Sequence, residues 1–250
     1  TTEIYTLSLH DALPICDQAI FRPQREALSQ AGISCSVGDL TKGCSIERMA
    51  QLVLRNAPDR FALAGLSMGG IVAMEICKQA PERVTHLALL NTTARADASG
   101  ATRKQQLGRV AAGHLDMVLR DELKPQYLAP ENRTPDILSS LESMGVQLGE
   151  HVFCRQTMAL TIRRSYLDSL EQIQCPVLLV AGAQDNVCPV DRHEEIAARI
   201  PGATLKVLER CGHISTLEQP DAVSEALLAL LDRPRAHLTR GENQHLTLVK

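Results

Sequence analysis

The sequence predicts an α/β fold in which helices cover both faces of a mostly parallel central sheet. Short apolar runs alternate with helical patterns over residues 16–91, and this alternation resumes over residues 171–232. The intervening residues 92–170 show charged helical patterns and no convincing strand-like run. Together these observations predict one core in two parts, with a helical insertion between them.

The first part of the core, residues 16–91, reads as strands and helices in alternation. Ser45 stands directly before apolar residues spaced three and four apart, so we expect it to cap the N-terminus of a helix. The predicted strands are 33–37, 61–64 and 84–90, and the predicted helices are 22–31, 46–57 and 69–79.

The remaining elements follow the same patterns. Within the insertion, helices are predicted at 103–112 and 137–148. In the second part of the core, strands are predicted from 177 and at 203–208, and helices at 193–200 and 221–231. Residues 233–250 are polar and aperiodic, and we expect a flexible tail there.

Bulk properties exclude several classes of protein. A chain of 250 residues with 44% hydrophobic and 22% charged residues has the composition of a globular domain. Its net charge of -3 gives no electrostatic reason to bind nucleic acid or anionic membranes, and no apolar run approaches the roughly 20 residues that span a bilayer. The eight cysteines are scattered and no secretory signal is visible, so we expect reduced thiols and a cytoplasmic location.

The most informative motif is Gly-Leu-Ser-Met-Gly-Gly at residues 65–70, between a strand pattern and a helical pattern. A serine on such a sharp turn needs small neighbours, and Gly65 and Gly69 supply that room. The turn would expose the hydroxyl of Ser67 and direct the backbone N–H of Met68 toward a bound substrate.

Two later residues complete a pattern with Ser67. Asp185 follows the strand-like run that begins at Val177, and His213 follows the run 203–208. All three residues lie just beyond the carboxyl ends of predicted strands, where open parallel sheets build their sites. Asp191 is a competing acid, but its position at the start of a helix favours a capping role.

These motifs resemble those of the α/β-hydrolase superfamily, with the order serine, acid, histidine along the chain. Ala-Pro-Glu-Arg-Val at 80–84, Gly-Ala-Gln-Asp at 182–185 and Gly-His at 212–213 add to the likeness, which covers about residues 16–232. The resemblance implies the α/β-hydrolase fold with a helical cap at 92–170. It also implies Ser67 as nucleophile, His213 as base, Asp185 as orienting acid and the Met68 N–H as an oxyanion donor.

The motifs leave the substrate open. The leading hypothesis is a serine hydrolase that cleaves a small carboxylic ester or thioester through an acyl-serine intermediate. A C–C bond hydrolase or lyase on the same triad, and a non-catalytic ligand receptor of the same fold, are the alternatives. Arg163 and Arg164 could bind a substrate carboxylate, although a solvated charged face is the favoured interpretation. Neither the substrate-binding residues nor the oligomeric state is predicted.

We expect neither a cofactor nor a metal ion. His86 lies within a strand pattern and is expected to pack in the core, whereas His114, His151 and His193 lie on helical patterns and are expected to be solvated. No pair of these histidines has metal-ligand spacing with a carboxylate or cysteine.

Residues 1–15 resemble the translation of a sequencing-library adapter, and we predict that the natural N-terminus is truncated. Superfamily members normally begin with a hairpin, a central strand and a loop that carries a second oxyanion donor. The run 4–9 has strand-like alternation and could fill the vacant central position, but His10 and Asp11 would suit a buried strand poorly. Pro14 would fall at the oxyanion donor and has no N–H, so we expect impaired activity.

Overall fold

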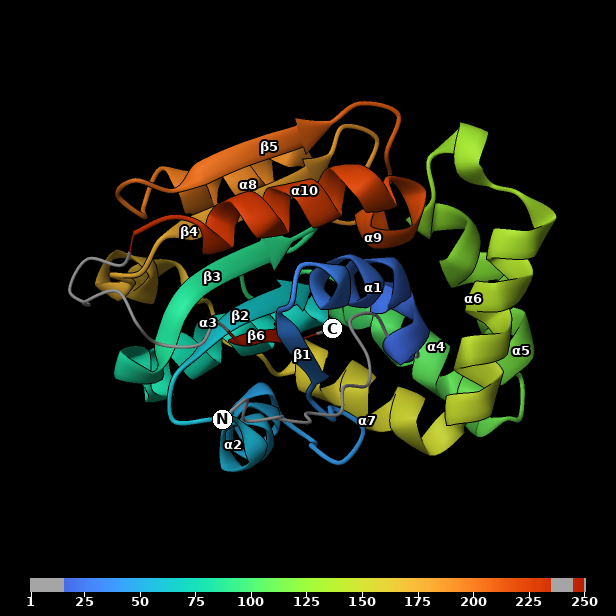
Figure 1. The fold of residues 1–250 in the computed structure, drawn as a ribbon. Coiled ribbons are helices and arrows are strands. Elements are labelled where there is room, and N and C mark those ends of the chain that lie inside the picture. The colour runs from blue at the N-terminus through green and yellow to red at the C-terminus, as the bar shows by residue number, and fades with distance from the viewer. Residues whose placement is uncertain (1–15, 235–244, 250) are drawn as a thin grey trace.

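The computed structural model describes residues 16–234 and 245–249. Its centre is a six-stranded sheet in the order β1-β6-β2-β3-β4-β5, in which every adjacent pair of strands is parallel (Figure 1). The strands are β1 (Ser34–Val37), β2 (Phe61–Leu66), β3 (Val84–Leu90), β4 (Val177–Gly182), β5 (Thr204–Leu208) and β6 (His245–Val249). Every residue of β2, β3 and β4 is buried, as expected for parallel strands covered on both faces.

Helices cover both faces of the sheet. Two of them, α1 and α10, pack against each other on one face, and α2 packs against α3 on the other (Figure 1). The hydroxyl of Ser45 accepts a hydrogen bond from the Arg48 N–H at 3.2 Å, so it caps α2 as predicted. The core helices and turns are η1 (Gln18–Phe21), α1 (Arg22–Gln30), α2 (Ile46–Asn56), α3 (Met68–Gln79), η2 (Pro81–Arg83), α8 (Val190–Ala197), α9 (Ser215–Glu218) and α10 (Pro220–Leu231).

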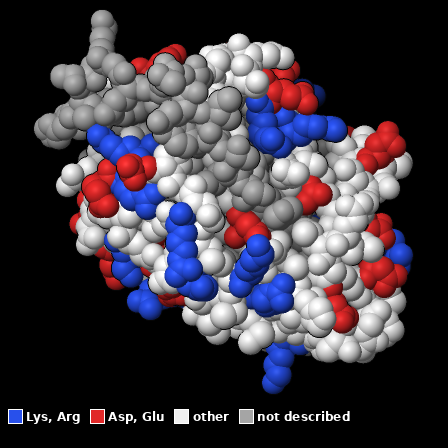
Figure 2. Space-filling view, turned by 60° about the horizontal axis from the view of Figure 1, so that its bottom comes forward, with Lys and Arg blue, Asp and Glu red and all other residues white. Residues whose placement is uncertain are grey.

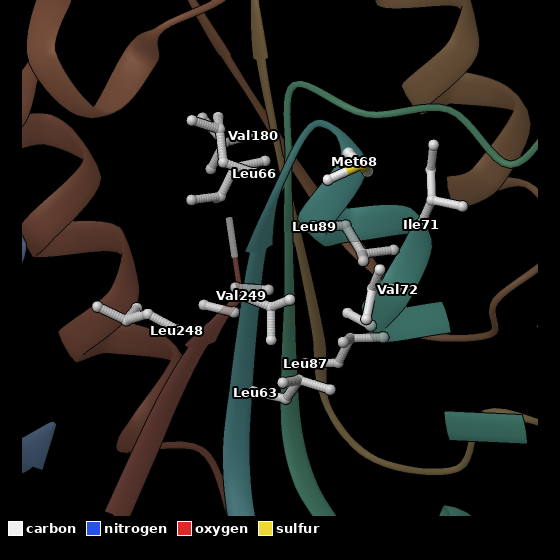
Figure 3. Packing of buried hydrophobic residues seen from close by; sticks show 14 of the residues in the cluster. Leu63, Leu66, Met68, Ile71, Val72, Leu87, Leu89, Val180, Leu248 and Val249 are labelled. Carbon is white, nitrogen blue, oxygen red and sulfur yellow. The ribbon is translucent and has the colours of Figure 1, made fainter. Parts of the chain in front are cut away.

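The hydrophobic core is continuous from the sheet into α3. Leu87 and Leu89 of β3 lie beside Val72 of α3, and Leu63 of β2 belongs to the same buried cluster (Figure 3). Because ten of the twelve residues of α3 are buried, this helix is apolar on nearly every side. It therefore holds the turn at its N-terminus in a fixed position against the sheet.

Residues 92–170 form helices and turns without a strand, as their pattern predicts. Residues 100–148 of this insertion lie beyond the carboxyl ends of the strands (Figure 1). The elements are α4 (Gly100–Ala111), α5 (Leu115–Met117), η3 (Val118–Leu123), η4 (Lys124–Tyr127), η5 (Pro130–Asn132), α6 (Pro135–Leu148), α7 (Glu150–Thr161) and η6 (Leu167–Gln172).

The prediction of a flexible tail over 233–250 is wrong for its last part. Strand β6 lies between β1 and β2 and pairs with both. Thr247, Leu248 and Val249 are buried there, and Figure 3 places Leu248 and Val249 in the core cluster. The physical reason is that the backbone groups of β1 and β2 that face this position need hydrogen-bond partners, which a short β-branched and apolar run supplies.

The expected occupant of this central position, residues 4–9, lies outside the described residues, as do His10, Asp11 and Pro14. Within 16–234 and 245–249, no helix combines the length and the apolar character needed to cross a membrane. Figure 2 shows Lys and Arg side chains interspersed with Asp and Glu on one face of the molecule.

Candidate active site

Ser67 occupies a strained turn between β2 and α3. Its backbone has φ 52° and ψ -113°, a left-handed φ that residues with a side chain rarely adopt. The turn is so tight that a Cβ on Gly65 would lie 2.3 Å from the carbonyl oxygen of Gly69. Glycine at position 65 is therefore a steric requirement, and the turn leaves the hydroxyl of Ser67 on a cavity wall.

The structure brings Ser67, His213 and Asp185 together in one hydrogen-bonded chain. His213 Nε2 lies 2.9 Å from Ser67 Oγ, and His213 Nδ1 lies 2.7 Å from Asp185 Oδ2. The side chains of His213 and Asp185 are fully buried. Because a carboxylate only accepts hydrogen bonds, Nδ1 carries the proton and Nε2 faces the serine as an acceptor.

The carboxylate of Asp185 is held in its ionised form. Oδ1 accepts hydrogen bonds from the backbone N–H groups of Val187 and Cys188 at 2.8 and 2.9 Å. Burial raises the pKa of Asp185, but the attraction to His213 and the hydrogen bonds from His213, Cys188 and Asn91 outweigh it, so the pKa lies below its usual value.

Asn91 is a site residue that the sequence analysis missed. It directly follows β3 with φ 44°, and its Nδ2 donates to Asp185 Oδ2 at 3.1 Å and to the Gly212 carbonyl at 3.0 Å. Its Oδ1 accepts from Ser215 Oγ at 2.5 Å. Asn91 thus links the acid loop to the histidine loop. Its position at the carboxyl end of a predicted strand was the available signal.

Glu218 is a second missed residue, and it fixes the loop that carries His213. Its carboxylate accepts from the backbone N–H of Gly212 at 2.9 Å and of Ile214 at 3.1 Å, which are the two neighbours of His213. The same carboxylate accepts from Ala129 N at 2.8 Å. It therefore joins the histidine loop to residues of the helical insertion, whose Tyr127 carbonyl accepts from His213 N at 2.7 Å.

Met68 is the first residue of α3, where a backbone N–H has no partner within the helix. Its side chain is buried in the core cluster that also contains Ile71 (Figure 3). The residue also lines the same cavity as Ser67. The Thr92 hydroxyl holds the other side of the turn by donating to the Ser67 carbonyl at 2.6 Å.

The expectation that His193 is solvated is wrong. Its side chain is fully buried, and Nε2 accepts from the Thr92 backbone N–H at 3.0 Å while Nδ1 lies 3.3 Å from the Pro189 carbonyl. Burial lowers the pKa of His193 to about 4, against the opposing effect of the Pro189 carbonyl. In contrast, His86 is buried in β3 as predicted, and His114 and His151 are exposed.

A cavity of about 370 Å³ opens onto Ser67 and Met68. Residues of the insertion form much of its wall, among them Leu123, Tyr127 and Leu160. A hollow of about 410 Å³ between β5 and α10 contains none of the predicted site residues, so the chemistry favours the cavity at Ser67.

The two adjacent arginines of the insertion differ in their environments. Arg163 is buried, with 6% of its side chain exposed, and it pairs with Asp97 at 3.1 Å. Arg164 has 63% of its side chain exposed and pairs with Glu47 at 3.3 Å. The solvated charged face expected for this pair is therefore right for Arg164 and wrong for Arg163.

Comparison with known proteins identifies the family. Residues 31–226 match the family model described as "Alpha/beta hydrolase family", so the chain belongs to the alpha/beta hydrolase family. It is 27% identical over 204 residues to a pimeloyl-[acyl-carrier protein] methyl ester esterase from Aromatoleum aromaticum, covering 74% of this chain and 79% of that protein. It is 29% identical over 228 residues to a putative carbamate hydrolase RutD from Azorhizobium caulinodans, covering 83% and 84%.

Solved structures show the same fold. A thermophilic esterase from Thermogutta terrifontis, with malate bound, superposes with a TM-score of 0.78 at 24% identity, covering 91% of this chain and 89% of that one. The enol-lactonase from Burkholderia xenovorans LB400 gives 0.79 at 22% identity, covering 93% of each chain. These structures confirm the α/β-hydrolase fold, and the family match together with the relatives named as esterase and hydrolase shows that the chain is a hydrolase, as the sequence predicts.

Proposed function

We propose that the protein is a serine hydrolase that cleaves a small carboxylic ester or thioester through an acyl-serine intermediate. The observation that carries this proposal is the unbroken hydrogen-bonded chain from Asp185 through His213 to Ser67. A serine hydroxyl is a weak nucleophile at neutral pH, and an adjacent imidazole acceptor is what activates it. Relatives named as methyl ester esterase and enol-lactonase support the same class of reaction.

The proposed mechanism follows from the protonation of His213. Ser67 Oγ attacks the substrate carbonyl while its proton passes to His213 Nε2. The imidazolium then returns this proton to the leaving alcohol or thiol, and water hydrolyses the acyl-serine by the same proton transfers in reverse. Asp185 keeps the imidazole in the required tautomer and stabilises its positive charge, since the carboxylate stays ionised.

The Met68 N–H is the proposed oxyanion donor. It stands at the N-terminus of α3, where both the free N–H and the helix dipole favour negative charge. One such donor is typically worth about 3 kcal/mol in the transition state. The strained φ of Ser67 supports this role, because the same turn sets the positions of the hydroxyl and of the N–H that follows it.

We further propose that residues 92–170 are a cap that shapes the substrate pocket. The cavity wall that they contribute and the contacts of Tyr127 and Ala129 with the histidine loop support this. A cap in this position would exclude water from the reacting carbonyl.

A fluorophosphonate probe tests the proposal, because it reacts with an activated serine and not with an ordinary one. We expect stoichiometric labelling of wild-type protein, located on Ser67 by peptide mapping, and none in Ser67→Ala. A protein that stays unlabelled while folded would support the ligand receptor instead.

A substrate panel then separates the two enzymatic alternatives. Methyl esters, thioesters and β-diketones of matched chain length should be compared on unlabelled protein from the same preparation. Turnover of the ester or thioester above that of the β-diketone is the expected result. The reverse order would favour C–C bond cleavage on the same three residues.

A further inference from the structure

The cavity at Ser67 has one polar wall, built from α4 and from Ser99, the residue directly before this helix. Ser99, Thr102, Arg103 and Gln106 all line the cavity. Their spacing of three and four residues places them on one face of the helix. Leu123, Leu160 and Val187 also line the cavity and give it an apolar wall. A ligand that fits both walls carries an apolar part and a polar or charged end.

The charged centre of the polar wall is a cluster of two arginines around one carboxylate. Asp97 Oδ1 accepts from Arg103 Nε and from Arg163 Nη1, both at 3.1 Å. The Asp97 and Arg163 side chains are only 2% and 6% exposed, and Arg103 is 20% exposed. The three side chains together carry one net positive charge. Burying charge without a matching partner is unfavourable, so a monoanion would complete the cluster.

The other cations of the cavity wall already have partners. Arg95 pairs with Glu195 at 2.7 Å, and Arg192 pairs with Asp191 at 3.2 Å. The uncompensated charge therefore lies at Arg103 and Arg163. Burial lowers the pKa of the Arg163 guanidinium, and the attraction to Asp97 only partly offsets this effect.

The two arginines differ in how many of their guanidinium nitrogens are free to donate a hydrogen bond to a ligand. Arg163 is tied down, because Nε donates to the Arg95 carbonyl and Nη1 donates to the Leu160 carbonyl as well as to Asp97. Arg103 is bound through Nε alone; in the part of the chain that the structure describes, nothing accepts from its Nη1 and Nη2. Asp97 thus orients the Arg103 guanidinium through Nε and leaves Nη1 and Nη2 free to donate to a planar anion.

We propose that Arg103 binds a substrate carboxylate, so that the preferred substrate of the Ser67 site is an ester or thioester that also bears one free carboxylate, such as a dicarboxylic half-ester. This inference rests on the proposed function of Ser67. A carboxylate matches the guanidinium fork and the single net charge of the cluster, whereas a phosphate would bring a second charge. The cavity of about 370 Å³ is at the small end of ligand sites and suits a short chain. Arg163 and Asp97 are positioning residues in this arrangement.

Matched substrates test the proposal. The monomethyl esters of succinate, glutarate and adipate should be compared with methyl butanoate, pentanoate and hexanoate, and with methyl 5-phosphonopentanoate. We expect kcat/KM for the best half-ester to exceed that of its neutral partner by at least about tenfold, since a charge-assisted bidentate pair has this strength. Equal values, or a faster phosphonate, would overturn the assignment to a carboxylate.

Variants locate the preference on Arg103. Arg103→Gln should lower kcat/KM for the half-ester by about 10- to 100-fold, mainly through KM, and change the neutral ester by no more than about twofold. Arg103→Lys keeps the charge without the fork and should retain part of the preference. Arg164→Gln is the matched control, because this exposed cation lies outside the cavity and its loss should change neither substrate. An equal fall for both substrates in Arg103→Gln would mean a structural role only.

A binding measurement separates this inference from the proposed chemistry. Calorimetric titration of monomethyl adipate into Ser67→Ala protein needs no turnover. Binding that is lost in Ser67→Ala/Arg103→Gln supports the carboxylate subsite even if the fluorophosphonate fails to label Ser67 in the wild type. Labelling of Ser67 in the wild type without such binding would refute the carboxylate subsite but would still support the proposed serine hydrolase.

Discussion

His193 should make the protein sensitive to mild acid. The imidazole is fully buried with an acceptor nitrogen facing the Thr92 N–H, so the folded protein holds it neutral. Burial lowers its pKa from the ordinary 6.5 to about 4, while Asp185 and Asp191 oppose the shift and His213 adds to it. The unfolded chain binds a proton at this residue below about pH 6.5, and the folded protein does so only near pH 4. Stability is therefore fully present above pH 6.5 and is lost as the pH falls toward 4.

The size of the effect follows from the same two values. Each pH unit between them removes up to about 1.4 kcal/mol from the free energy of unfolding, and the whole interval removes about 3 kcal/mol. That loss is a large share of the roughly 5–15 kcal/mol by which domains are stable. The activity of the folded protein should fall through this residue only near pH 4, because a protonated His193 cannot accept from Thr92, whose hydroxyl holds the Ser67 carbonyl.

Urea unfolding followed by far-UV circular dichroism measures this prediction at constant ionic strength between pH 4 and pH 8. His193→Gln keeps an acceptor oxygen for Thr92 and cannot titrate, so its free energy of unfolding should depend less steeply on pH below 6.5. His151→Gln replaces an exposed histidine of α7 and should follow the wild type. Parallel pH curves for the wild type and His193→Gln would refute the reasoning.

Three further predictions concern the site and the sheet. Ser67→Ala and His213→Ala should each lower kcat for the ester by up to about a millionfold while the protein still unfolds cooperatively. Because the two residues act as a unit, the double variant should be no less active than either single variant. Losses in kcat that add in the double variant would contradict this. Glu218→Gln should lower kcat by about 10- to 100-fold with little change in KM, because weaker hydrogen bonds to the backbone on both sides of His213 would misplace this base. An unchanged kcat would show that the Glu218 carboxylate is not needed to hold His213 in position. Leu248→Asp should lower the free energy of unfolding by at least about 3 kcal/mol because its side chain is fully buried, and urea unfolding that matches the wild type would show that β6 is dispensable.

Local rules account for the parts of the fold that the sequence predicts well. Strand β3 has the predicted bounds, 84–90, and the predicted helix after Ser45 differs from α2 by one residue. Both depend on patterns within about a dozen residues, namely an apolar run and a capping hydroxyl before an amphipathic period. The turn at Ser67 is equally local, since glycine spacing around one serine defines it.

Pairings between distant residues account for what the sequence does not reveal. Asp97, Arg103 and Arg163 meet only because the insertion folds back on itself, and no spacing rule relates them. The helical pattern around His193 predicts a solvated side chain, although Ile196 three residues later marks the same face of α8 as buried. What buries the imidazole is the need of the Thr92 N–H for an acceptor, which only the assembled sheet creates.

Strand β6 extends this argument to the nucleophile itself. Val249 pairs with Gly65, two residues before Ser67, and Leu248 pairs with Ala64. On its other edge β2 pairs with β3, whose last residue Leu90 accepts a hydrogen bond from Ser67 N at 2.9 Å. The strained turn is thus fixed by strands on both sides, and one of them comes from the opposite end of the chain. Because a strained backbone persists only where its surroundings determine it, we expect losses of stability in β6 to appear also as losses of reactivity at Ser67.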